Sequence, residues 1–355
     1  MQRMWTLDGL RGLAAISVVI YHGLYWHEGR LYSSAGKYAV YLFFILSALT
    51  LAKVYRSRFD KTLDSSELLK FYRNRVARII PLLSLVALLG FGFEFLRGGD
   101  LAVEGTKMIL TATGAFGFAA AGVTANSVGA WSLGVEIVFY ALFPIIAILT
   151  YNSNLINVIF AAIIVNILQL VHNLFVFNYI SGSDYWPLYT MPLSFASYFA
   201  WGMVLALLPE RQWSMGWLGF PLIFTVVWVS AIIEVSDAAL LAWPGALIGP
   251  LSLAVATYLI TSWRAPFSLV PVFDFLGSIS YSIYLLHPLI YFLMTRTVWP
   301  AGAGNPFVFV MVLTGASMIV AWLTHRIFEQ PMRDVLRGSP VSKIAIQRRE
   351  RGSEA

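Results

Sequence analysis

Cysteine is absent from this sequence of 355 residues. Its absence excludes a disulfide framework, a thiolate metal site and an enzyme that carries its covalent intermediate on a thiol. Charged residues are also few, because Asp, Glu, Lys and Arg make up 12% of the chain, compared with about 25% in ordinary soluble domains. This shortage of charge excludes a typical water-soluble globular protein.

Hydrophobic residues, in contrast, are abundant. They make up 59% of the chain, and the mean hydropathy is +0.73. The sequence also holds 12 Trp, 17 Tyr and 25 Phe. Membrane proteins concentrate Trp and Tyr where the bilayer meets water. This composition predicts an integral membrane protein.

Long apolar runs recur from one end of the chain to the other. They are long enough to cross a bilayer as helices, and too long and continuous for the strands of a membrane barrel. The sequence therefore predicts an all-α, polytopic transmembrane helical bundle of about ten spans. The expected spans are residues 10–27, 36–54, 79–96, 130–150, 154–178, 189–208, 214–234, 239–262, 276–297 and 303–326. Residues 98–129 are apolar but rich in small residues, and can form an eleventh span or a re-entrant or interfacial segment.

Basic residues cluster in two places. One cluster lies in residues 53–78, between two expected spans, and the other in residues 326–351, after the last span. Positively charged loops remain in the cytoplasm. Both clusters lie there only if an even number of spans separates them, so we expect that residues 98–129 do not cross and that both termini are cytoplasmic. The net charge of +6 is then a topology signal, helped by contact with anionic membrane lipids, and gives no reason to expect a nucleic acid partner.

The chain shows no internal repeat, low-complexity segment or linker. We therefore expect one transmembrane domain over residues 1–337 and a basic cytoplasmic tail over residues 338–355. Near the N-terminus, Asp8 and Arg11 interrupt the apolar stretch, and no small-residue cleavage site follows it. We interpret this segment as retained, and not as a cleaved signal peptide.

The stretch LDGLRGLAAISVVIYHG, residues 7–23, places Arg11 and His22 in an apolar run. Eleven residues make three helical turns plus about 20°, so both side chains lie on one helix face, about 16 Å apart along the axis. Arg11 is then near the cytoplasmic surface, and His22 lies beyond the middle of the membrane. Ionisable groups at this depth are usually functional. Alternatively, Arg11 reaches the surface and pairs with Asp8, while His22 makes a structural hydrogen bond between helices.

Arg75 and Arg78 share a helix face just before an expected span. Arginine is suited to bidentate binding of phosphate. The other interpretation, favoured for this cluster in isolation, is a basic anchor for lipid headgroups.

Two further ionisable residues lie inside expected spans. Glu136, in AWSLGVEIVFYALFP, is a carboxylate that needs a partner, and it either orients a His or Arg or ties two helices together. His287, in GSISYSIYLLHPLIYF, precedes Pro288, which frees the carbonyl one turn earlier and opens a polar position in the helix. A His before a Pro is more often structural than catalytic.

Taken together, these stretches resemble the acyltransferase 3 family of bacterial integral-membrane O-acyltransferases that act on carbohydrates. The family pattern begins with an Arg, ten residues and a His, and continues with a span like LFFILSA, an Arg-x-x-Arg pair, WSL-x-VE-x-x-FY, S-x-YLLH and FEQPMR. The corresponding positions here are Arg11 with His22, residues 42–48, Arg75 with Arg78, and residues 131–140, 282–287 and 328–333. Two positions depart from the pattern. Tyr41 stands where relatives often have an acidic residue and Ala48 where they often have Gly, so no role of that acidic residue is carried over.

The resemblance implies an enzyme of the bacterial cytoplasmic (inner) membrane. It would transfer an acyl group, usually acetyl, from cytoplasmic acyl-CoA to a hydroxyl of a carbohydrate or lipid-linked glycan at the outer face. Acyl-CoA is then a co-substrate, and we expect neither a permanently bound cofactor nor a metal.

The resemblance also suggests roles for the residues singled out above. We expect Arg11, Arg75 and Arg78 to hold the CoA phosphates. We expect His22 to be the general base, since imidazole accepts protons near neutral pH, with Glu136 and His287 as further catalytic candidates. The acceptor side is expected to be lined by Trp131, Tyr140 and Tyr281.

A transporter or flippase of a polar or anionic solute is the alternative from another class. Buried Arg, His and Glu also mark solute pathways. The absence of the internal symmetry common in transporters argues against it. Turnover of acetyl-CoA by the purified protein separates the two readings, because a pure transporter has no acyl transfer to show.

Overall fold

The computed structural model describes residues 5–28, 33–59, 64–180, 185–232 and 236–338. The predicted tail, residues 338–355, lies outside the described residues except for its first position. The described chain is helical, with one isolated backbone bridge between Trp213 and Trp263. The helices are α1 (Trp5–Glu28), α2 (Ser33–Tyr55), η1 (Arg56–Arg58), α3 (Ser65–Leu96), α4 (Leu101–Thr113), η2 (Ala115–Phe118), α5 (Ala121–Thr124), α6 (Ala130–Tyr151), α7 (Leu155–Tyr179), α8 (Tyr185–Tyr189), η4 (Pro192–Phe195), α9 (Ala196–Leu207), η5 (Ser214–Leu218), α10 (Gly219–Ile232), α11 (Asp237–Leu241), α12 (Gly245–Thr261), η6 (Phe267–Leu269), α13 (Val270–Thr297), α14 (Pro306–Thr324), η7 (His325–Glu329) and α15 (Gln330–Leu336).

The prediction of an all-α, polytopic membrane bundle is confirmed. Among the described residues, seven helices are long and apolar enough to cross a membrane, and three shorter apolar helices accompany them. The shorter ones are Pro192–Leu207, Ser214–Val227 and Gly245–Thr261. Each of the ten predicted segments corresponds to one of these helices. The segment 98–129 forms α4, η2 and α5 instead, and the 13 residues of α4 rise only about 20 Å, less than the ~30 Å of a hydrocarbon core.

Helix α3 begins well before the predicted start of its span at residue 79. The side chain of Asp64 caps its N-terminus by accepting a hydrogen bond from the backbone N–H of Ser66 at 2.9 Å. A hydropathy pattern cannot detect these early turns, because their surface is charged. As a result, Arg75 and Arg78 lie inside a continuous helix whose geometry fixes their spacing.

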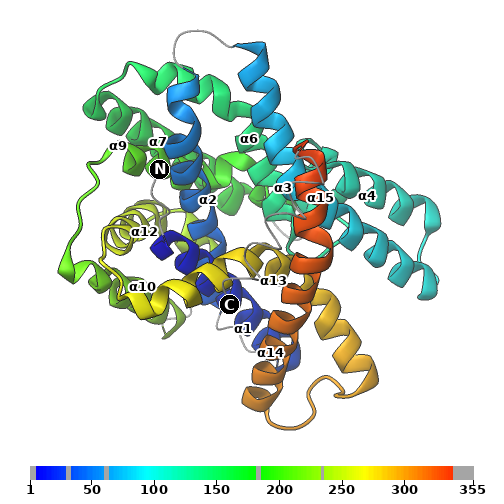
Figure 1. The fold of residues 1–355 in the computed structure, drawn as a ribbon. Coiled ribbons are helices and arrows are strands. Elements are labelled where there is room, and N and C mark those ends of the chain that lie inside the picture. Colours follow the sequence, from blue (N-terminus) through cyan, green and yellow to red (C-terminus); the bar gives the residue numbers. More distant parts are fainter. Residues whose placement is uncertain (1–4, 29–32, 60–63, 181–184, 233–235, 339–355) are drawn as a thin grey trace, which may run out of the picture.

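Helices α1 and α2 run through the middle of the molecule (Figure 1). Helices α7, α9, α10 and α12 lie on one side of them, and α3, α4, α14 and α15 on the other. The most extensive helix contact joins α1 to α13. Glycine permits it, since a Cβ on Gly12 would lie 2.4 Å from the Cβ of Leu276, and one on Gly277 would lie 2.5 Å from the Cβ of Asp8. Small residues allow close backbone approach in this way in membrane bundles.

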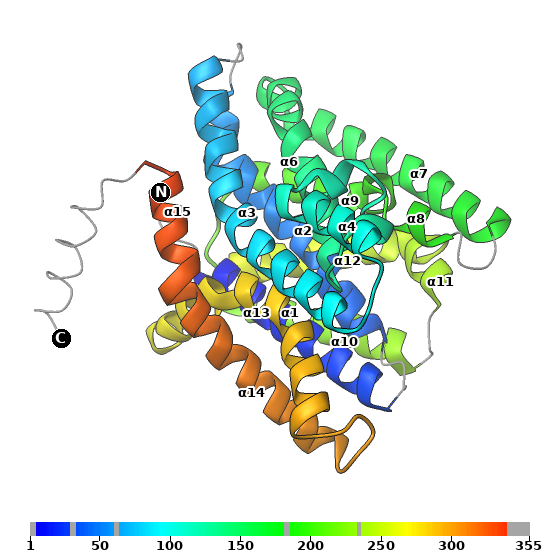
Figure 2. The same cartoon turned by 90° about the vertical axis from the view of Figure 1, so that its right-hand side faces the viewer.

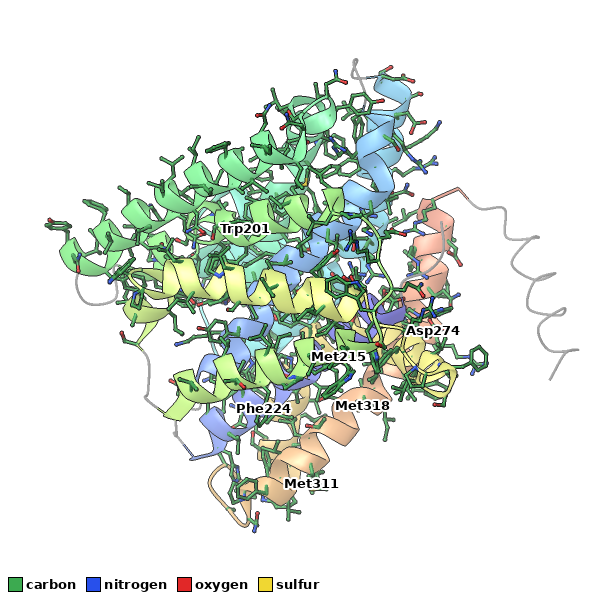
Figure 3. The ribbon with its side chains drawn as sticks, turned by 90° about the vertical axis from the view of Figure 1, so that its left-hand side faces the viewer. Trp201, Met215, Phe224, Asp274, Met311 and Met318 are labelled. Carbon is green, nitrogen blue, oxygen red and sulfur yellow. The ribbon has the colours of Figure 1, made fainter. Side chains whose placement is uncertain are left out.

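Apolar side chains cover the outside of the bundle. Met215, Phe224 and Met311 project from the face drawn in Figure 3 and are more than half exposed, as expected for a lipid-facing surface. Several polar side chains of α7 are buried instead, among them Asn166, Gln169 and Asn173. Asn166 donates to the backbone carbonyl of Ala246, and Asn173 to that of Leu241. These bonds satisfy backbone carbonyls next to α11 and α12, where the helical pattern is interrupted.

Candidate active site

A cavity of about 340 Å³, here called the basic cavity, lies between α1, α2, α3, α6, α13 and the C-terminal segment. Its lining has more arginines than carboxylates, so it carries a net positive charge. The charged residues of the lining are Arg11, Arg75, Arg78, Arg333, Arg337, Asp8 and Glu136.

Arg11 is held in this cavity by contacts to two helices. Its Nη2 donates to Thr50 Oγ1 at 2.6 Å and to the carbonyl of Leu46 at 3.3 Å, both on α2. Its Nη1 lies 3.7 Å from Asp8 Oδ1 on α1. The pairing with Asp8 considered in the sequence therefore exists, and Arg11 lines the cavity as well. Its positive charge is fixed in position before any ligand binds.

Arg75 and Arg78 are held by aromatic rings and not by carboxylates. The guanidinium of Arg75 lies 5.6 Å from the ring of Tyr140, and that of Arg78 lies 6.0 Å from the ring of Tyr281. Among the described residues, neither arginine has a carboxylate within 4.0 Å. The buried Nε atom of Arg75 also has no hydrogen-bond partner there. Because buried donors without partners are unfavourable, this arrangement suits an anion bound in the cavity.

Glu136 lies in the wall of the basic cavity, on α6. Its Oε1 accepts hydrogen bonds from the hydroxyls of Ser47 and Tyr140. Tyr281, on α13, donates its hydroxyl proton to the carbonyl of Ile79 at 2.7 Å. Ser47, in the LFFILSA stretch of α2, therefore lines the basic cavity and donates a hydrogen bond to the Glu136 carboxylate.

Two arginines of the C-terminal segment also line the basic cavity, and neither was predicted as a site residue. Helix α15 packs beside α3, as Figure 2 shows, and this contact places Arg333 and Arg337 at the basic cavity. The π-helical turn η7 sets the direction of α15. Its Glu329 is 2% exposed and accepts hydrogen bonds from Ser282 at 2.8 Å and from His325 at 3.0 Å. The FEQPMR stretch was the available signal, but sequence alone does not show which helix it packs against.

A second cavity of about 390 Å³, here called the aromatic cavity, lies between α1, α2, α6, α8 and α13. Lys37 is the only Lys, Arg, Asp or Glu in the lining formed by the described residues. The rings of Trp186 and Tyr189 stack at a centroid distance of 5.2 Å and an angle of 13°. The cavity thus offers flat aromatic faces and hydroxyl groups. Its other ring-bearing residues are Tyr21, His22, Tyr25, Tyr41, Trp131, Tyr185 and Tyr284.

His22 of α1 and His287 of α13 are joined by a hydrogen bond. His22 Nδ1 lies 2.8 Å from His287 Nε2, and His287 Nδ1 lies 2.8 Å from the carbonyl oxygen of Tyr284. A carbonyl oxygen only accepts, so Nδ1 of His287 carries a proton. When both rings are neutral, Nε2 of His287 accepts the proton of His22 Nδ1. This assignment leaves Nε2 of His22 as a free proton acceptor.

This chain of hydrogen bonds ends on the backbone carbonyl of Tyr284, and Pro288 leaves that carbonyl free to accept. A proline has no N–H, so the residue four positions earlier, Tyr284, lacks its usual helical partner. His287 donates to that carbonyl. The ring of His22 is also fixed by Trp26, which stacks on it at 4.4 Å and 6°. The position and tautomer of His22 are therefore determined from two sides.

The structure divides the predicted site residues into two groups. The basic cavity contains Arg11, Arg75, Arg78, Glu136, Tyr140 and Tyr281. The aromatic cavity contains His22 and Trp131. His287 is fully buried, lines neither cavity and is hydrogen-bonded to His22. Tyr140 and Tyr281, which we expected on the acceptor side, thus lie with the arginines. In the described part of the chain, no three His, Asp or Glu side chains are grouped so as to hold a metal ion.

Most of the chain is similar in sequence to a known protein family. The sequence profile of an acyltransferase domain, that of the acyltransferase 3 family, matches residues 4–326. Among curated proteins, the O-acetyltransferase OatA of Staphylococcus aureus, in strains NCTC 8325 / PS 47, COL and MRSA252, is 26% identical over 190 residues. That match covers 50% of this chain but only 30% of each relative's length. No solved structure matches.

The residues matched by the family profile include most of the candidate site. The profile covers nearly the whole chain and includes both cavities and the paired histidines, apart from Arg333 and Arg337. The motifs quoted from the sequence also lie around these cavities, although they are far apart along the chain. This multi-pass membrane protein therefore belongs to the acyltransferase 3 family of membrane O-acyltransferases.

Proposed function

We propose that this protein moves an acyl group, in the first place acetyl, from cytoplasmic acyl-CoA to a hydroxyl of a carbohydrate or glycoconjugate at the outer face of the bacterial inner membrane. The observation that carries the proposal is the pair of cavities. One is lined by arginines, the other by aromatic rings and a histidine with a free acceptor nitrogen. The name of the related O-acetyltransferases supports acetyl as the group transferred.

The basic cavity suits the phosphates of CoA. Arg75, Arg78 and Arg337 offer guanidinium groups without carboxylate partners among the described residues, and guanidinium forks match phosphate oxygens. The cavity also has the depth for an extended arm, because its lining includes both Val40 and Thr50 of α2, about 15 Å apart along the helix. The charged end of the donor would lie at the arginines and the thioester near Val40.

The chemical step uses the free nitrogen of His22. The acceptor hydroxyl gives its proton to His22 Nε2 as its oxygen bonds to the thioester carbonyl carbon. The carbon–sulfur bond then breaks, and the CoA thiolate takes the proton back from the imidazolium. The products are an acylated sugar and CoA thiol, and no acyl-enzyme is required. General base catalysis of this kind contributes roughly 10²–10⁴ to the rate.

His287 acts on this step through His22. The hydrogen bond from His22 Nδ1 to His287 Nε2 fixes the tautomer of His22. When His22 becomes an imidazolium, His287 Nε2 still accepts the proton of His22 Nδ1. Glu136 has a different role in this proposal. Together with Ser47 and Tyr140, it shapes the wall beside the donor arm in the basic cavity.

The aromatic cavity suits a sugar acceptor. Pyranose rings present flat C–H faces that pack on aromatic rings, while their hydroxyls bond to phenols and indole N–H groups. Trp131 lies 5.7 Å from the ring of Tyr189 and 5.9 Å from that of Trp186, in one cluster at the cavity wall. An orientation with both termini in the cytoplasm places the basic cavity on the side where acyl-CoA is made.

The test of this function has two parts. Purified protein in detergent should bind CoA, and membranes that contain it should release CoA thiol from acetyl-CoA. Mass spectrometry should then detect acetylated surface glycans in cells with the gene and not in cells without it. A His22→Gln variant serves as the control, because it keeps hydrogen bonding but cannot accept a proton at neutral pH. CoA binding without any release of thiol or change in glycans would contradict the proposal and favour a transporter.

A further inference from the structure

The two cavities share two lining residues, Val40 of α2 and Tyr284 of α13. We infer that these two side chains form a collar that holds the acyl group of the donor and restricts its chain length. The inference rests on the proposed function and adds to it the residues that select the donor.

Tyr284 forms the rigid side of the collar. Its hydroxyl donates to the carbonyl of Gly129 at 2.8 Å and lies 2.7 Å from Ser132 Oγ. Phe43 packs edge-on against its ring at 5.8 Å. The backbone carbonyl of Tyr284 also holds His287. Moving the ring aside would break both contacts of its hydroxyl and its packing against Phe43.

Val40 forms the adjustable side. Its neighbours along α2 each line only one cavity. Lys37 and Tyr41 line the aromatic cavity, and Phe43 and Ser47 line the basic cavity. Val40 is 8% exposed, and it lines both cavities. A change of one carbon at this residue therefore alters the width of the collar directly. No polar group of Val40 is involved, so the effect of substitution is one of shape.

The acyl group must lie at the collar for geometrical reasons. The arginines that suit the CoA phosphates line only the basic cavity, and His22 lines only the aromatic cavity. The thioester carbon must be attacked by an oxygen whose proton goes to His22, so it has to lie at their shared wall. Any carbons beyond the carbonyl then contact Val40 and Tyr284. Acetyl is the group this arrangement favours, and each added methylene meets more resistance.

The experiment compares acetyl-, propionyl- and butyryl-CoA as donors. Release of CoA thiol is measured in detergent-permeabilised membranes, which retain the endogenous acceptors. One methylene in a shaped pocket is worth about 10- to 200-fold in specificity. Because butyryl has two more methylenes than acetyl, wild-type protein should lose about 100-fold or more in kcat/KM from acetyl to butyryl. Val40→Ala should recover most of that loss for butyryl, and Val40→Leu should lower propionyl turnover further.

Val86→Ala is the matched control. Val86 is fully buried in α3 and lines neither cavity, so it loses the same two methyl groups without touching the collar. Its chain-length profile should equal that of the wild type. If Val40→Ala and Val40→Leu keep the wild-type ratios while acetyl transfer continues, the collar is refuted and the proposed function stands. If the wild-type protein neither binds CoA nor releases thiol from any donor, both fail together.

Discussion

Replacing His287 by alanine tests how the paired histidines work. The change leaves the Nδ1 proton of His22 and the carbonyl of Tyr284 without their partner at a buried position. An unsatisfied buried group costs about 1–3 kcal/mol, and each 1.36 kcal/mol is tenfold in rate. If the loss at His22 falls on the transition state, turnover of acetyl-CoA should drop by about 5- to 160-fold. Binding of CoA should be unchanged, because His287 lines neither cavity.

His287→Gln is the informative partner of this variant. A glutamine can accept the His22 proton with its carbonyl oxygen and donate to Tyr284 with its amide nitrogen, so it preserves the direction of both hydrogen bonds. We expect it to recover most of the lost rate. His22→Gln should not be tolerated in the same way, and should lower turnover by roughly 10²–10⁴ while leaving CoA binding intact.

The assay combines three measurements on each variant. Thiol release gives the rate, calorimetry with CoA gives donor binding, and thermal unfolding in detergent shows whether the protein is folded. If His287→Gln is as inactive as His22→Gln, His287 itself takes part in proton transfer and the positioning role is wrong. Near-normal transfer by His22→Gln would show that His22 only ties helices together, and would move the base to His287 or Glu136.

Three further predictions concern the donor site, the helix packing and the topology. Arg75→Ala and Arg78→Ala should each weaken CoA binding, measured by calorimetry, by about 1.5–3 kcal/mol, the usual worth of a hydrogen bond to a charged group. Arg58→Ala should do little, because Arg58 lies beside Glu67 at 3.7 Å and is half exposed, and equal losses in all three would indicate a general lipid anchor. Gly12→Ala should lower the unfolding free energy by about 1–3 kcal/mol, because its Cβ would lie 2.4 Å from that of Leu276, whereas Gly315→Ala in α14 meets nothing within 4 Å and should not destabilise the protein. Reporter fusions after residue 337 should read cytoplasmic, and fusions at residues 100 and 126 should both read external; opposite readings at these two points would mean that the segment between them crosses the membrane.

The fold was largely predictable because the bilayer requires long apolar helices. Each predicted span corresponds to a helix of the structure, including the shorter Gly245–Thr261. The errors lie at helix ends, where hydropathy carries no information. Helix α3 starts at Ser65 because Asp64 caps it, and α13 starts at Val270, before the predicted residue 276. Capping and packing determine such ends more than average hydropathy does.

The candidate site was predictable only in part. Helical periodicity predicted that Arg11 and His22 share one helix, and both lie in α1. The arginine pair at residues 75 and 78 was visible in the sequence, although in isolation it favoured a lipid anchor over a phosphate site. Sequence could not give the hydrogen bond between His22 and His287, since depth in a membrane does not specify which helix is the neighbour. Arg337 could not be found either, because only the packing of α15 on α3 brings it to the cavity.

Helix α1 runs without interruption from Trp5 to Glu28, and this continuity fixes the spacing of the residues along it. The distance of about 16 Å between the Cα atoms of Arg11 and His22 is set by the rise of the backbone, and no rotamer change can adjust it. Adding one residue between them would turn His22 by about 100° away from its partner, and adding four would restore the face within about 40° but move it about 6 Å along the axis. Under the proposed function, different acceptors can be accommodated by exchanging side chains of the aromatic cavity, whereas a donor with a shorter arm would require a different first helix.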